Sequence, residues 1–119
     1  MERIRFITHN DKQVLLVDVS SCSPAEVERI VHSLPDHVTS QPRDSLLLCA
    51  DFTGSSFNDD ALRTMKEVAV FDKAYIKKAA WVGTEGLPHS YREDVSKFSR
   101  RKFPEFKSIP EALDWLTKD

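Results

Sequence analysis

The feature that most limits the fold of this chain is an unbroken apolar run in its middle. Residues 45–52 read Ser-Leu-Leu-Leu-Cys-Ala-Asp-Phe, with no charged side chain between Leu46 and Ala50. A strand without alternation of polar and apolar residues is buried on both faces, as in the centre of a parallel sheet. Strands that are separated by helices pair in parallel, so the run predicts an α/β fold.

Further strands and helices are predicted on both sides of this run. Strands are expected at 3–8 and 14–19, joined by an Asn10-Asp11 turn into an antiparallel hairpin, and at 78–83. A short segment at 103–106 reads as an edge strand, where proline is tolerated. The helices are expected at 23–34, 58–73 and 87–101 and from 108 onward. The order ββαβαβα(β)α predicts a mixed, mainly parallel sheet of four or five strands with about four helices.

Two helix starts have the same chemistry. Ser23 and Ser108 each stand three residues before a glutamate, which is typical of a capping box, and each is followed within two residues by a proline that the first helical turn tolerates. Pro35 is expected to stop the first of these helices, with a polar loop continuing to Arg43.

Composition excludes several classes of protein. The chain has 119 residues, 40% of them hydrophobic, and is expected to form one domain over residues 1–119. A net charge of −2 gives no bulk attraction to nucleic acid. No apolar run is long enough for a membrane span, and the first residues lack the apolar core of a signal peptide. Cys22 and Cys49 form no CxxC motif, which favours a reducing compartment, so we expect a cytoplasmic protein.

A small polar turn follows the apolar run and leads into an acidic helix start. Ligands of such sheets bind outside the carboxyl ends of the strands, where this turn and a second, glycine-containing loop are expected. Hydroxyl groups near a helix N-terminus suit phosphate or carboxylate, although a purely structural turn has the same composition. The candidate interaction surface comprises Thr53, Gly54, Ser55, Ser56, Asn58, Asp59, Asp60 and Arg63, and the candidate neighbouring loop comprises Gly83, Thr84, Glu85 and Gly86.

The sequence offers little for catalysis or for a bound cofactor. The four histidines share no metal-ligand spacing, and the loop at 83–86 lacks the lysine of a phosphate-binding P-loop. Ser55 or Ser56 with His89 and Asp51 would complete a hydrolytic trio, but neither serine lies in a GxSxG motif. We therefore expect no catalytic residue, no metal and no cofactor.

The polar turn is similar to a known family pattern. Residues 51–59 read Asp-Phe-Thr-Gly-Ser-Ser-Phe-Asn-Asp, close to the STAS pattern Asp-Leu-Ser-Gly-Val-x-Phe-x-Asp. With the order of elements, this resembles the SpoIIAA-like fold that STAS domains and bacterial anti-sigma factor antagonists share. Residues 81–87, 98–102 and 112–116 are more similar to a branch of small STAS-like bacterial proteins, which are also compared with CRAL-TRIO lipid-binding domains.

The resemblance implies a non-enzymatic regulatory or protein-interaction module. In the antagonists, a serine that follows the last Asp of the pattern is phosphorylated, whereas Asp60 and Ala61 follow Asp59 here. The chain is expected to lack this switch, with Asp60 supplying part of the negative charge. The CRAL-TRIO comparison implies the alternative, a carrier of a small apolar ligand or lipid. A homodimer through the 103–106 edge or the first hairpin is a further expectation.

Overall fold

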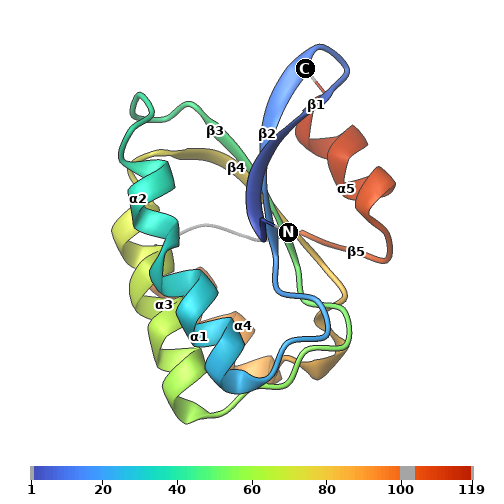
Figure 1. Cartoon of the computed structure of the whole chain (residues 1–119). Helices are drawn as coiled ribbons and strands as arrows, with labels where there is room; N and C mark the ends of the chain where they lie inside the picture. The colour runs from blue at the N-terminus through green and yellow to red at the C-terminus, as the bar shows by residue number, and fades with distance from the viewer. Residues whose placement is uncertain (1, 100–103, 119) are drawn as a thin grey trace.

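A computed structural model of the chain describes residues 2–99 and 104–118 (Figure 1). The predicted Phe103 of the edge strand and part of the motif at 98–102 lie outside these ranges. The elements, in chain order, are β1 (Ile4–His9), β2 (Lys12–Asp18), α1 (Pro24–His32), α2 (Leu34–Val38), β3 (Leu46–Asp51), α3 (Asp59–Asp72), β4 (Ile76–Val82), the 3₁₀ turn η1 (Thr84–Gly86), α4 (His89–Ser99), β5 (Glu105–Phe106) and α5 (Ile109–Leu116).

The five strands form one sheet in the order β1-β2-β3-β4-β5. β1 is antiparallel to β2, whereas β2, β3, β4 and β5 pair in parallel. In this register Asp18, which ends β2, lies beside Asp51, which ends β3, and Asp51 lies beside Val82 of β4. The predicted mixed, mainly parallel α/β sheet is confirmed.

Helices cover the two faces of the sheet unequally. Figure 1 shows α1, α2, α3 and α4 on one side of the sheet and α5 alone on the other. The alternate residues of β3 follow this division, because Leu48 and Ala50 belong to the core under α1–α4 while Cys49 belongs to the core under α5. The central apolar run is therefore buried on both faces, as predicted.

The first hairpin turns through the two residues that the sequence indicated. Asn10 and Asp11 have φ angles of 51° and 64°. Two consecutive residues with positive φ are typical of a type I′ turn, whose twist matches that of the flanking strands. Asparagine and aspartate tolerate this conformation better than other residues with a side chain.

The structure corrects the interpretation of Pro35. The sequence predicted a polar loop from this proline to Arg43, but Pro35 lies in the first turn of the short helix α2. A proline in the first turn removes no helical hydrogen bond, because the amide groups there have no partner inside the helix. β4 also begins earlier than predicted, at Ile76, and α4 begins at His89 after the 3₁₀ turn. Within the described ranges, no helix has the length and apolar character needed to cross a membrane.

Candidate functional site

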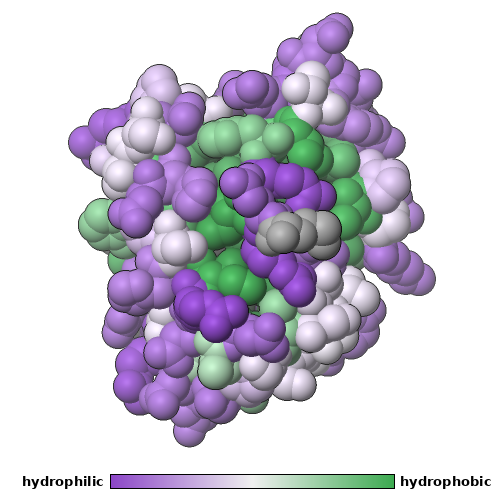
Figure 2. Space-filling view, viewed as in Figure 1, coloured by the Kyte–Doolittle hydropathy of each residue, from purple (hydrophilic) through white to green (hydrophobic). Residues whose placement is uncertain are grey.

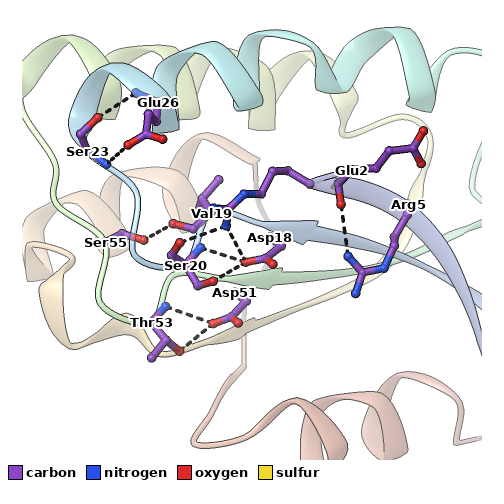
Figure 3. A network of polar contacts seen from close by, with 11 residues as sticks. Glu2, Arg5, Asp18, Val19, Ser20, Ser23, Glu26, Asp51, Thr53 and Ser55 are labelled. Atoms are coloured by element: carbon purple, nitrogen blue, oxygen red, sulfur yellow. Dashed lines mark hydrogen bonds and ion pairs between the residues drawn. The ribbon is translucent and has the colours of Figure 1, made fainter.

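Two carboxylates end neighbouring strands and turn the chain in the same way (Figure 3). Oδ1 of Asp51 accepts hydrogen bonds from the amide of Thr53 at 3.0 Å and from its hydroxyl at 2.6 Å. Oδ1 of Asp18 accepts from the amide of Ser20 at 3.0 Å and from its hydroxyl at 2.6 Å. Each is a side-chain turn of the kind that aspartate favours at the end of a strand.

Asp18 is held in its ionised form. Burial by itself raises the pKa of this carboxyl, but the hydroxyl and amide of Ser20 and the positive charge of Arg3 lower it, and the net shift is downward. Nη1 of Arg3 lies 3.5 Å from Oδ1 of Asp18 and also donates to the carbonyl of Ser20 at 3.0 Å. The turn after β2 is therefore stabilised by a charge.

The 53–56 turn is hydrogen-bonded to the loop that follows β2. The amide of Ser21 donates to the carbonyl of Thr53 at 2.8 Å, and the amide of Ser56 donates to the carbonyl of Cys22 at 3.0 Å. The hydroxyl of Ser55 donates to the carbonyl of Val19. The hydroxyl groups of Thr53 and Ser55 already donate hydrogen bonds within the protein, so they are not available to bind an anion. This weakens the interpretation of the segment as an anion site.

The second candidate loop packs directly against the first, as the topology predicted. Gly83 has a φ of 67°, and a Cβ atom added there would lie 2.2 Å from Oγ1 and 2.7 Å from Cα of Thr53. A Cβ atom on Gly86 would lie 3.2 Å from the carbonyl oxygen of Ser55. The loop is also anchored to β5, because the buried Thr84 hydroxyl donates to Glu105. Only glycine at 83 allows the two loops to approach this closely.

The start of α3 presents a fixed acidic surface. Asn58 caps the helix by accepting a hydrogen bond from the amide of Ala61 at 2.8 Å. Asp59 and Asp60 follow in the first turn and are exposed. Oδ1 of Asp60 lies 3.5 Å from Nη1 of Arg63. These carboxylates interact favourably with the helix dipole and disfavour an anion at the same place.

The remaining hypothetical site residues do not form a hydrolytic trio. Asp51 accepts from Thr53, Ser55 donates to Val19, and Nε2 of His89 lies 2.9 Å from Oε1 of Glu93. Within residues 2–99 and 104–118, no group of three or more His, Cys, Asp and Glu side chains is placed to hold a metal ion.

The outer face of α3 carries exposed apolar side chains that the sequence analysis did not single out. Val70 is 42% exposed and Phe71 is 59% exposed. Their spacing from Asp60, Arg63 and Glu67 places all five on the solvent side of the helix. Apart from Phe6 of β1, these are the exposed large hydrophobic residues in the described part of the chain.

A buried carboxyl group at the far end of α3 also escaped the sequence analysis. Asp72 is fully buried, and neither of its carboxyl oxygens has a hydrogen-bond partner among the residues that the structure describes. Burial raises its pKa to about 7. The spacing of Ala61, Met65 and Val68 on the buried side of the helix continues to Asp72, so helical periodicity was the signal that could have found it.

Asp72 lines a cavity of about 80 Å³ between the sheet and the helices above it. Figure 2 shows hydrophobic side chains gathered in a hollow in the middle of one face, beside the helices on the left. Apart from Asp72 and Lys73, the described residues around the cavity are apolar or aromatic, and they include Leu34, Leu48, Met65, Ile76, Trp81 and Tyr91.

Comparison with known proteins identifies the fold. No protein-family model and no curated protein matches the sequence. A crystal structure of an uncharacterised protein of the DUF3478 family from Shewanella loihica PV-4, with a SpoIIAA-like fold, matches with a TM-score of 0.72 and covers 95% of this chain and 91% of its own. The fold is SpoIIAA-like. The two sequences are 18% identical, so the similarity concerns the fold alone.

Proposed function

We propose that this SpoIIAA-like chain is a non-enzymatic regulatory module that binds a protein partner on the outer face of α3 and the adjoining 53–60 turn. The observation that carries the proposal is the exposure of Val70 and Phe71 on the helix face that begins with Asp60. Contiguous exposed apolar side chains bordered by charged residues are typical of interaction sites.

The charges of this face indicate the chemistry of the partner. Asp59, Asp60 and Glu67 are opposed by Arg63, so the stripe is acidic at its start and apolar at its end. A complementary partner presents basic side chains next to an apolar patch. The carboxylates of Asp59 and Asp60 are part of the sequence and are not added by a modification, so binding through them needs no phosphorylation.

A site-specific crosslink tests this surface in the cells that produce the protein. Phe71 is replaced by the photoreactive residue p-benzoylphenylalanine, and Phe6, which is 37% exposed on β1, receives the same replacement as the matched control. We expect a discrete crosslinked protein with the probe at position 71 and none with the probe at position 6. Adding D60R to the Phe71 variant removes the adduct, because it reverses the charge at the start of the stripe. The absence of an adduct at position 71, or equal adducts at both positions, contradicts the proposal.

The cavity beneath α3 favours a second candidate function, binding of a small apolar ligand. Among the described residues, its walls are mostly apolar. A volume of about 80 Å³ is below the roughly 300–1,000 Å³ of sites that hold drug-sized ligands. The cavity therefore suits a compact molecule better than a whole lipid.

A further inference from the structure

A second hollow lies on the face of the sheet that α5 covers, at the amino-terminal ends of β2, β3 and β4. Its volume of about 450 Å³ is within the roughly 300–1,000 Å³ of sites that hold small organic molecules. No acidic side chain is among its described lining residues. We call it the lysine groove, because its lining includes four of the nine lysines of a chain with a net charge of −2, namely Lys12, Lys77, Lys78 and Lys118.

An irregularity in β4 brings two successive lysines to this groove. Leu46 pairs with Ile76 and Leu47 pairs with Lys78, so the register between β3 and β4 skips Lys77. Successive residues of a regular strand point to opposite faces of the sheet. An extra residue re-aims the side chains around it, and such irregularities are frequent next to functional sites. Both Lys77 and Lys78 therefore line the groove, where a regular strand would supply one of them.

One of the four cations is held in place by α5. Nζ of Lys78 donates to the backbone carbonyl of Lys118 at 3.0 Å and lies 5.0 Å from the centroid of the Trp115 ring. This contact satisfies a carbonyl just after the helix, where the helix dipole favours a cation. An ammonium group has three donors, so a lysine that makes one such contact is still able to donate to an anion.

The groove also has an apolar part. Leu47 and Leu116 line it, and both pack in the core under α5. The acidic side chain of α5 that lies nearest in the sequence, Asp114, is paired elsewhere, because its Oδ1 lies 2.7 Å from Nε2 of His9. The groove therefore combines a cluster of positive charges with two leucine side chains.

We propose that the lysine groove binds a small organic anion that carries two or more phosphate groups on a short carbon skeleton. Lysine binds phosphate as a point charge, and four lysines spread around the groove match separated negative charges better than a single one. Leu47 and Leu116 lie against the carbon skeleton. This site goes beyond the proposed protein-binding surface, since α3 lies on the other face of the sheet (Figure 1).

Amide NMR titration of the full chain tests the proposal at about 0.1 M salt, with 1,4-butanediol bisphosphate, butyl phosphate and 1-butanol as probes. These probes share one carbon chain and carry two, one and no phosphate groups. We expect the bisphosphate to shift the amide signals of Gln13 and Leu47, which line the groove, and to leave those of Thr53 and Asp60 unchanged. Its affinity is expected to be at least about tenfold above that of butyl phosphate, and 1-butanol causes no shift.

Charge variants assign the binding to the groove. K77Q is expected to weaken bisphosphate binding about fivefold and K12Q/K77Q at least about twentyfold, while K77R, which keeps the charge, stays within about twofold. K107Q is the matched control, because Lys107 is exposed and does not line the groove, and its affinity is unchanged. Asp119 follows Lys118 and lies outside the described residues. D119N is expected not to weaken binding, because it removes a charge of the same sign as the ligand.

Several results would overturn the proposal. They are equal affinities for the bisphosphate and butyl phosphate, unchanged binding by K12Q/K77Q, an equal loss in K107Q and K77Q, or weaker binding by D119N. Sedimentation with phosphatidylcholine vesicles that contain phosphatidic acid covers the other source of phosphate groups. Vesicle binding that K12Q/K77Q abolishes, without any shift by the bisphosphate, would replace the soluble ligand by a membrane surface. None of these results affects the α3 surface, which the crosslink tests separately.

Discussion

The carboxylates near the start of α3 and the one at its end differ in their hydrogen-bond partners. Near its start, at the carboxyl ends of β2 and β3, Asp18 and Asp51 each accept hydrogen bonds from a hydroxyl and an amide two residues onward. At its end, Asp72 accepts none from the residues that the structure describes. The pKa of Asp18 is accordingly lowered, while burial raises the pKa of Asp72 to about 7.

This contrast distinguishes two carboxylates that stabilise the fold, Asp18 and Asp51, from one that does not, Asp72. The turns at Asp18 and Asp51 give the carboxyl oxygens local donors, so these side chains stabilise the ends of the strands. Asp72 stabilises nothing in the described structure, and its ionisation costs free energy. Three substitutions test this contrast and are given in order of decreasing expected change in stability.

D72N gives the largest effect, and it is stabilising. The folded-state pKa of about 7 lies above the ordinary value of 3.8, so the native carboxyl holds its proton where the unfolded one has lost it. The wild type therefore loses stability as the pH rises from about 4 to about 7, whereas the asparagine does not titrate. We measure the free energy of unfolding of both proteins in urea at pH 3.5 and at pH 8. Between these two pH values, we expect the stability of D72N to rise relative to that of the wild type by up to about 4 kcal/mol.

A pH-independent difference between D72N and the wild type would contradict this assignment. It would mean that Asp72 is neutralised by a partner in solution or is accessible to water. The D36N variant, which removes an exposed carboxylate from α2, is expected to follow the wild-type pH profile throughout.

G83A tests how closely the 83–86 loop packs against Thr53, which follows β3. The new Cβ would lie 2.2 Å from Oγ1 of Thr53 in a backbone conformation with a φ of 67°, so the hydroxyl must leave Asp51. We expect a loss of about 3 kcal/mol in the free energy of unfolding. G54A is the matched control, because its φ is also positive at 71° but its nearest neighbour, Oγ of Ser21, is 3.3 Å away. The expected loss in the free energy of unfolding of G54A is about 1 kcal/mol. Equal losses in both variants would show that backbone strain, and not the contact with Thr53, causes the destabilisation.

D18N gives the smallest effect. Asparagine still accepts a hydrogen bond from Ser20 but carries no charge for Arg3, so we expect a loss of about 1 kcal/mol at pH 7. Because the folded-state pKa of Asp18 is lowered, its contribution is present above about 3.8 and disappears as the pH falls through the folded-state value. Thermal unfolding of D18N and the wild type should therefore converge in acid. A constant gap down to low pH would show that the charge of Asp18 contributes nothing.

Most of the fold could be predicted because its signals are local. The Asn10-Asp11 turn, the Ser23 capping box and the Asn58 cap are each determined by a few adjacent residues, and all three are present. The helix α2 was missed because Pro35 is compatible both with a helix end and with a helix start. The choice depends on the burial of Leu34 and Val38, which is not a local property.

The candidate site was predicted only in its position. The order of parallel strands was enough to predict that the 53–60 turn and the 83–86 loop lie at the same edge of the sheet, because connections in such sheets follow a single geometry. Helical periodicity would also have placed Asp72 on the inward side of α3, although the sequence analysis did not use it. The hydrogen bond from Ser55 to Val19, and the lack of a donor to Asp72 among the described residues, could not be predicted in this way. Hydrogen-bond partners from distant segments depend on how the elements pack, and no local pattern encodes them.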